Sequence, residues 1–177
     1  MKRRTVLTGL TLAPAAVVAN PVLGQGTGIA EADPGDSGVP ISVPAIQQWT
    51  PRRGSYEYKP NVPIMLASCT AELRSVAETF AENLGAITGS RPRIVSSKGT
   101  PTGGIILRLG DQKKGPESYR IDVDKSLVVT GTTAHGVFNA TRTVLQWLQR
   151  CHRLPTGTAL DWPVKQVRSL LIDNTPR

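Results

Sequence analysis

Two carboxylates at close spacing, Asp122 and Asp124, are the side chains of this sequence that most resemble an acid–base pair. Two positioned carboxyl groups can act as a general acid and a general base when one of them holds a proton and the other does not. Residues 119–123 alternate as a strand does, and Asp124 begins a turn, so the two side chains should leave the same face. We interpret them as solvent-facing residues of a hairpin and not as catalysts.

Neither histidine belongs to a recognisable catalytic group. His135 precedes the second expected helix, and no nucleophile or orienting carboxylate accompanies it in the pattern. His152 follows Cys151 in a loop, without an Asn or Asp partner.

The sequence also lacks a phosphate-binding loop and a metal site. The glycine-rich run 99–104 lacks the lysine and the strand–loop–helix order of a phosphate-binding loop. The spacing of the cysteines does not resemble a metal site.

Near the C-terminus, residues 167–172 form a short, mostly apolar segment. Arg168 lies at its start, and Asp173 follows its end. Such a run predicts a strand buried on both faces, which is typical of parallel sheets and barrels. Active sites of barrels form at the C-terminal ends of strands, where Asp173 would lie. One strand of this kind cannot satisfy its backbone hydrogen bonds alone. We therefore expect a protein that continues into a second domain.

The preceding residues predict one α/β domain, an α+β sandwich. Thr70–Thr88 and Ala134–Arg150 carry apolar residues at spacings of three and four, as amphipathic helices do. Thr70 can cap the first helix and Gly89 can end it. Strands are expected at 54–58, 63–67, 93–95, 105–109, 119–123 and 127–130, with 158–160 as a last edge strand. These elements predict a mainly antiparallel sheet with both helices on one face.

The N-terminus predicts export. Lys2, Arg3 and Arg4 precede a weakly apolar stretch, 8–18, and small residues follow at 22–24. This order is typical of a signal peptide of the twin-arginine type over 1–24. Residues 25–42 are rich in Gly, Ala, Asp, Pro and Ser and predict a disordered linker. No run of 18 apolar residues indicates a membrane span.

The net charge of +8 comes from scattered basic residues. Without a basic stripe interleaved with aromatic residues, nucleic-acid binding is not expected. An exported protein meets oxidising conditions, which permit a disulfide between Cys69 and Cys151 if their geometry allows it. The two residues flank different helices, so parallel helices would place the two sulfurs far apart and exclude the bond.

The residues also resemble a known family. Arg168–Asp173, Arg-Ser-Leu-Leu-Ile-Asp, is similar to the opening of the first barrel strand in family 20 glycoside hydrolases, the β-N-acetylhexosaminidases. Tyr119–Val123, 126–131 and 134–148 resemble, in order and spacing, the small α/β domain that precedes that barrel. The resemblance covers about 43–177. It departs from the family at Asn139-Ala140, where an aromatic-Gly pair is usual, and at Pro176, where the family commonly has Arg.

The resemblance implies a domain at 43–162 and the start of a truncated (β/α)8 barrel at 163–177. It implies a secreted β-N-acetylhexosaminidase that removes terminal N-acetyl-β-D-hexosamine residues by substrate-assisted retaining catalysis, acting on chitin oligosaccharides or glycoconjugates. Arg168 would hold sugar hydroxyls, with Asp173 orienting it or the substrate. No metal or organic cofactor is implied. The family's catalytic Asp-Glu pair is missing here, so the 177 residues alone should be an inactive fragment.

Three alternatives remain open at this point. The first is another glycosidase with the same leading domain: a lacto-N-biosidase, a family 84 type or an α-glucuronidase. The second is a secreted carbohydrate- or cell-wall-binding module without catalysis. The third is the truncated product of a broken gene.

Overall fold

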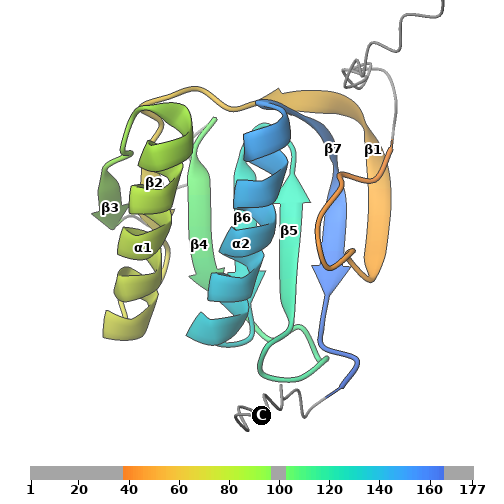
Figure 1. Cartoon of the computed structure of the whole chain (residues 1–177). Coiled ribbons are helices and arrows are strands. Elements are labelled where there is room, and N and C mark those ends of the chain that lie inside the picture. Colours follow the sequence, from red (N-terminus) through yellow and green to blue (C-terminus); the bar gives the residue numbers. More distant parts are fainter. Residues whose placement is uncertain (1–37, 97–102, 166–177) are drawn as a thin grey trace, which may run out of the picture. The chain divides into compact units, whose positions relative to one another are not determined.

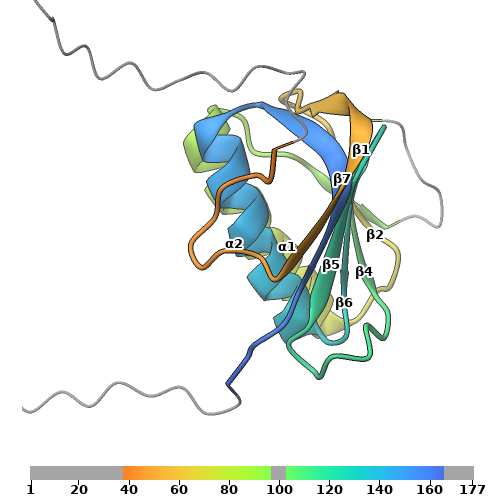
Figure 2. The ribbon, with the colours of Figure 1, turned by 90° about the vertical axis from the view of Figure 1, so that its right-hand side faces the viewer.

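The computed structural model describes residues 38–96 and 103–165, and every structural statement below concerns these residues. They form a seven-stranded sheet in the order β1-β7-β5-β6-β4-β2-β3. Both helices cover one face of this sheet and leave the other face open (Figures 1 and 2). In chain order the elements are β1 (Gln48–Glu57), β2 (Ile64–Leu66), α1 (Ala71–Thr88), β3 (Ile94–Ser96), β4 (Ile105–Leu109), β5 (Tyr119–Val123), β6 (Leu127–Gly131), α2 (Ala134–Arg150) and β7 (Arg153–Asp161).

Helix α1 has the ends and the buried stripe that its sequence predicts. The Thr70 hydroxyl accepts a hydrogen bond from the Leu73 N–H at 3.2 Å, which satisfies one of the free donors of the first turn. Gly89 ends the helix in the left-handed conformation, with φ 76°, which a residue without a Cβ adopts at little cost. Five side chains pack against the sheet: Leu73, Ala77, Phe80, Ala81 and Leu84.

Helix α2 also begins and ends where it was predicted. Thr133 caps it by accepting from the Gly136 N–H at 3.3 Å, and the Thr133 hydroxyl donates to the Pro116 carbonyl at 2.7 Å. Gly136 is required by packing, because a Cβ there would lie 2.6 Å from the Ser118 carbonyl oxygen. The cap and this glycine together place the first turn of α2 directly against the loop before β5.

The sheet is evenly mixed, whereas the sequence predicted a mainly antiparallel one. The pairs β2–β3, β2–β4 and β4–β6 are parallel, and β1–β7, β5–β6 and β5–β7 are antiparallel. Each helix is a crossover that returns the chain in the same direction, so β3 is parallel to β2, and β7 runs in the same direction as β6. As a result, α1 and α2 run parallel to each other, as the colours in Figure 1 show.

The prediction of a last edge strand at 158–160 is wrong in two respects. Strand β7 is longer, Arg153–Asp161, and it lies inside the sheet between β1 and β5. The physical reason is β1, which extends over Gln48–Glu57 and covers β7 from Gln48↔Leu160 to Glu57↔Arg153. The edge strands of the described sheet are therefore β1 and β3.

The core lies between the sheet and the helices. Its largest fully buried side chains include Trp147, Phe80, Leu73, Ile105 and Ile121. Trp49 of β1 contacts Trp147 of α2, and Gly157 of β7 makes room for the Trp49 ring. Neither helix is long and apolar enough to span a membrane.

Cys69 and Cys151 are both free thiols. Cys69 precedes the start of α1 and Cys151 follows the end of α2. Because these helices are parallel, the two cysteines lie at opposite ends of the helical layer, too far apart for a disulfide.

Candidate functional site

The two residues that the sequence singled out for substrate binding, Arg168 and Asp173, lie outside the described residues, as does the expected barrel strand 167–172. The signal peptide and most of the expected linker lie outside them too. The described part of the chain offers two depressions, one on each side of the sheet.

Asp122 and Asp124 leave the same face of the sheet, as predicted, and share Arg52 as a partner. The Arg52 guanidinium lies 3.2 Å from the Asp122 carboxylate and 3.8 Å from that of Asp124. Asp122 differs from a simple solvent-facing residue, because its side chain is only 17% exposed. Arg120 donates to both of its oxygens at 2.8 Å, and Thr158 donates at 2.8 Å.

These contacts set the charge of Asp122. Burial alone would raise its pKa, but the hydrogen bonds from Arg120 and Thr158 and the positive charges of Arg120 and Arg52 outweigh burial and lower the pKa. The carboxylate is therefore ionised at neutral pH and has no proton to give. It cannot serve as a general acid, which agrees with a structural role.

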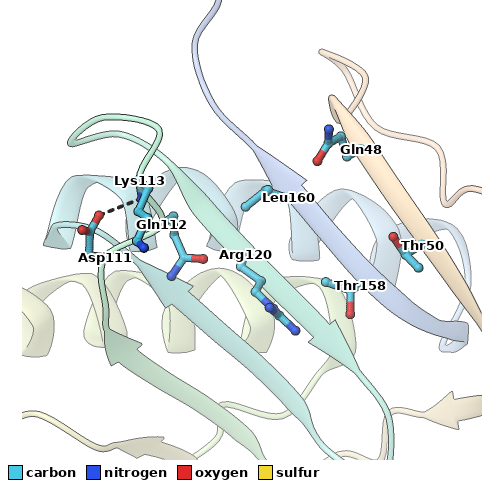
Figure 3. Close-up of a pocket in the computed structure, with 8 residues that line it drawn as sticks. All are labelled: Gln48, Thr50, Asp111, Gln112, Lys113, Arg120, Thr158 and Leu160. Atoms are coloured by element: carbon cyan, nitrogen blue, oxygen red, sulfur yellow. Dashed lines mark hydrogen bonds between the residues drawn. The ribbon is translucent and has the colours of Figure 1, made fainter.

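We call the first depression the polar hollow. It lies on the open face of the sheet, has a volume of about 300 Å³ and is shown in Figure 3. Strands β1, β5 and β7 supply its floor, because alternate residues of a strand leave the same face. The loop after β4 forms its rim. Its lining residues are Gln48, Thr50, Asp111, Gln112, Lys113, Arg120, Thr158 and Leu160.

The rim of the polar hollow is held by local hydrogen bonds. The Asp111 carboxylate accepts from the Lys113 N–H at 2.7 Å, the contact drawn in Figure 3. Lys113 itself has a positive φ of 55°. The Gln112 amide nitrogen donates to the Gly110 carbonyl at 2.9 Å, and its N–H donates to the Thr132 hydroxyl at 3.1 Å. These bonds fix the backbone that carries Lys113.

We call the second depression, which residues 161–165 line on one side, the exit groove. Its volume is about 580 Å³. It lies on the side of the sheet that carries the helices. It is lined by residues 43–45 and 47, by residues 161–165, by Glu117 and Tyr119, and by the α2 residues His135, Asn139, Arg142, Thr143 and Gln146.

Two exposed apolar side chains line the exit groove. Among the described residues, the large hydrophobic side chains that are exposed are Val39, Ile41, Val43 and Val164. Val43 and Val164 line the groove itself and are 75% and 70% exposed. Trp162 lies beside them, with the Lys114 ammonium 4.6 Å from its ring centre. A surface that exposes apolar side chains at one place is typical of an interaction site.

The remaining candidates do not form a catalytic centre. His135 is exposed in the first turn of α2, and His152 packs its ring against Tyr58, with ring centres 6.2 Å apart. Cys151 accepts a hydrogen bond from the Arg153 N–H at 3.4 Å, and among the described residues no hydrogen bond links it to a histidine. Within 38–96 and 103–165, no three His, Cys, Asp or Glu side chains come together as metal ligands.

The tryptophans do not form a platform for sugar stacking. Trp49 and Trp147 contact each other below the sheet, with Trp147 almost fully buried, and Trp162 lies apart with Lys114. Trp49 lies in the edge strand β1, and Trp147 lies on the buried side of α2.

Comparison with known proteins identifies relatives. The family model described as glycosyl hydrolase family 20, domain 2, matches residues 40–162. A lacto-N-biosidase of Bifidobacterium bifidum is 31% identical over 130 residues, which are 70% of this chain and 11% of that protein.

Solved structures agree with this match. The N-acetyl-β-hexosaminidase of Streptomyces plicatus superposes with a TM-score of 0.60 at 25% identity, over 70% of this chain and 26% of that one. The family 20 β-N-acetylhexosaminidase of Streptomyces coelicolor A3(2) gives a TM-score of 0.59 at 25% identity, with the same coverage. The chain thus spans a small part of each relative that it matches.

Proposed function

The chain belongs to glycosyl hydrolase family 20, of which it carries domain 2, and we propose that it serves a β-N-acetylhexosaminidase as the domain that supports a catalytic barrel. The match over 40–162 carries this proposal. The enzyme would remove terminal N-acetyl-β-D-hexosamine residues from chitin oligosaccharides or glycoconjugates. The structures of Streptomyces hexosaminidases, one of them in complex with its product GlcNAc, support that substrate class.

The chemistry of this proposal is substrate-assisted. The acetamido oxygen of the substrate attacks the anomeric carbon in place of an enzyme carboxylate while the bond to the leaving oxygen breaks. Water then attacks the same carbon and opens the oxazolinium intermediate, and the two inversions together retain the configuration. One carboxylate would orient the acetamido group and a second would protonate the leaving oxygen. Asp122 is ionised and bonded to two arginines, so neither role falls to it. We propose that both carboxylates lie outside the 177 residues, and that Arg168 and Asp173 contribute to the sugar site.

The exit groove is the surface by which this domain would support the barrel. It exposes Val43 and Val164, it includes Trp162, and it is lined by residues 161–165 at the end of the matched domain. The outward side of α2 adds a stacked pair, with the Arg142 guanidinium 4.7 Å from the Phe138 ring centre. Burying Val43 and Val164 would remove their large exposed apolar surfaces from water, at about 25 cal/mol per Å².

Two experiments test the proposal. The purified 177-residue chain should not hydrolyse an aryl β-N-acetylglucosaminide, while the protein extended by the downstream coding sequence should. Activity of the 177 residues alone would contradict the assignment of the carboxylates. In the extended protein, Val164→Asp should lower the thermal midpoint, but in the 177-residue chain it should not. An equal loss of thermal midpoint in both proteins would contradict a docking role for the exit groove.

A second function, lacto-N-biosidase activity, is favoured by the Bifidobacterium bifidum relative, which is 31% identical. That enzyme's name indicates release of a disaccharide, whereas a hexosaminidase releases one sugar. The extended protein should be offered an aryl lacto-N-bioside and an aryl N-acetylglucosaminide side by side. Faster turnover of the disaccharide substrate would replace the first proposal with this one.

We also propose export by the twin-arginine route. The support is the sequence alone, Arg3-Arg4 before the mild apolar stretch 8–18. Replacing both arginines by lysine should leave a fused reporter inside the cell, and unchanged export would contradict this route.

A further inference from the structure

We propose that the polar hollow binds an anionic saccharide unit, a sugar ring that carries one carboxylate or sulfate. The hollow is on the open face of the sheet. Gln48, Arg120 and Leu160 line it, while their chain neighbours Gln47, Tyr119 and Asp161 line the exit groove. Because successive residues of a strand leave opposite faces, the two depressions are on opposite sides of the domain. The inference is therefore independent of the function proposed above.

Arg120 is prepared to receive the anion. Its Nε and one Nη donate to Asp122 at 2.8 Å each, which fixes the plane of the guanidinium. Asp122 is held in turn by Thr158 and Arg52. The other Nη of Arg120 has no partner among the described residues, and the side chain is 47% exposed. A donor held in this way loses little conformational entropy when a ligand arrives.

Lys113 provides the second positive charge. No ion pair engages it in the described part of the chain, and the hydrogen bond from its N–H to Asp111 fixes its backbone at the rim. Of the charged residues that line the hollow, Arg120 and Lys113 are positive and Asp111 is negative. Arg120 shares the Asp122 carboxylate with Arg52, so the groups that an anion would meet are the Lys113 ammonium and the remaining Nη of Arg120.

The opposite side of the hollow suits hydroxyl groups. Gln48 and Thr50 of β1 face Leu160 and Thr158 of β7 in register. The side chains of Gln48 and Thr50 make no hydrogen bond to other described residues, so an amide and a hydroxyl remain for a ligand. Leu160 lies between them and Arg120 in Figure 3 and offers an apolar contact for the C–H face of a sugar ring.

Size and composition narrow the ligand class. A volume of about 300 Å³ is at the small end of ligand pockets. None of the eight lining residues is aromatic, so the hollow lacks the stacking surface that a nucleobase needs. A single sugar unit with one negative group matches the donors, the hydroxyl partners and the apolar contact together.

Titration of the ¹⁵N-labelled 177-residue chain tests the inference. The ligands are glucuronic acid and glucose 6-sulfate, with glucose, sodium acetate and sodium sulfate as controls. We expect at least one charged sugar to shift the amide signals around Gln48, Lys113 and Arg120 at lower concentration than any control. The two charged sugars distinguish a carboxylate from a sulfate. Equal affinity for acetate or sulfate alone, equal affinity for glucose, or no shift with either charged sugar would overturn the inference.

Substitutions then locate the site. Lys113→Gln removes one charge and Thr50→Val removes one hydroxyl at nearly constant size, and each should weaken binding about fivefold, the effect of roughly 1 kcal/mol at an exposed site. Lys59→Gln, in the exposed loop beyond the far end of β1, is the matched control and should change nothing. Unchanged amide spectra elsewhere show that the variants fold. Unchanged binding by Lys113→Gln, or equal weakening by Lys59→Gln, would contradict a site at the polar hollow.

Discussion

Trp49 and Trp147 meet edge to face, with their ring centres 6.1 Å apart and their planes at 79°. Trp49 belongs to the edge strand β1 and Trp147 to α2, so this contact ties the edge of the sheet to the helical layer. Edge-to-face aromatic pairs contribute about 0.5–1.5 kcal/mol beyond the apolar area that they bury. The pair is the aromatic link between these two elements in the described core.

Replacing Trp147 by alanine should destabilise the domain by about 3–5 kcal/mol, because the side chain is 2% exposed and leaves a large cavity. Chemical denaturation of the 177-residue chain measures this loss. A double-mutant cycle with Trp49→Ala isolates the pair itself, and we expect a coupling near 1 kcal/mol. A coupling of zero would show that the two rings act only through their separate burial.

Gly136→Ala should destabilise the domain although alanine favours helices. A Cβ at this position would lie 2.6 Å from the Ser118 carbonyl oxygen, so α2 must move away from the loop before β5. We expect a loss of about 1–3 kcal/mol, the usual cost of overpacking. Gln149→Ala, at an exposed position of the same helix, is the control and should be neutral. Equal denaturation midpoints for the two variants would refute this packing constraint.

Asp122→Asn should lower the free energy of unfolding by roughly 1–3 kcal/mol at neutral pH, since it leaves Arg120 and Arg52 without their shared anion. The pKa of Asp122 is lowered in the folded state below its usual 3.8, so the folded state binds fewer protons there than the unfolded state. The stabilisation is present above pH 3.8 and is lost as the pH falls through the lowered folded pKa.

Denaturation of this variant and of the parent chain at several pH values checks the sign. The two curves should converge at acid pH and separate as the pH rises. Asp124→Asn is the control, because its side chain is 65% exposed and its ion pair with Arg52 is long at 3.8 Å. It should change stability by less than about 0.5 kcal/mol. A gap for Asp122→Asn that stays constant over the whole range would refute the role of its charge.

Both cysteines should react with a thiol reagent in the native chain after purification without reducing agent, because neither is in a disulfide. Cys69 is exposed and should react with a thiol reagent faster than Cys151, which is partly covered. Reducing agent should leave the thermal midpoint unchanged, because no bond between the two sulfurs is broken. A mass lower by two hydrogens in the unreduced chain would contradict the parallel arrangement of α1 and α2.

Local structure followed from the sequence where local chemistry decides it. Thr70 and Gly89 fixed the two ends of α1, and the apolar stripe of α2 fixed its buried side. The strand at 105–109 and the hairpin across Asp124 were predicted for the same reason, since alternation and turn residues are local signals. The sandwich with both helices on one face followed from the order of these elements, and the resemblance supplied the family, which the match over 40–162 confirmed.

Strand directions and the polar hollow could not be predicted in the same way. The position of β7 inside the sheet depends on β1, which lies about a hundred residues earlier in the chain. The polar hollow likewise brings together Gln48, Lys113 and Leu160, which lie far apart in the sequence. One signal was present: polar residues at 48 and 50, at 120 and 122, and at 158 alternate with apolar residues that face the core. The role of Arg168 stays a prediction.

The pairing of β1 with β7 has a consequence for biosynthesis. Strand β1 has a single neighbour, so Gln48 finds its backbone partners only after Leu160 has emerged from the ribosome. Until then the nascent chain carries an unsatisfied strand and the indole of Trp49 in water, a state that invites misassociation with other chains. The first strand to be synthesised is therefore among the last to form its backbone hydrogen bonds. Folding of the domain is in this way coupled to the completion of its translation.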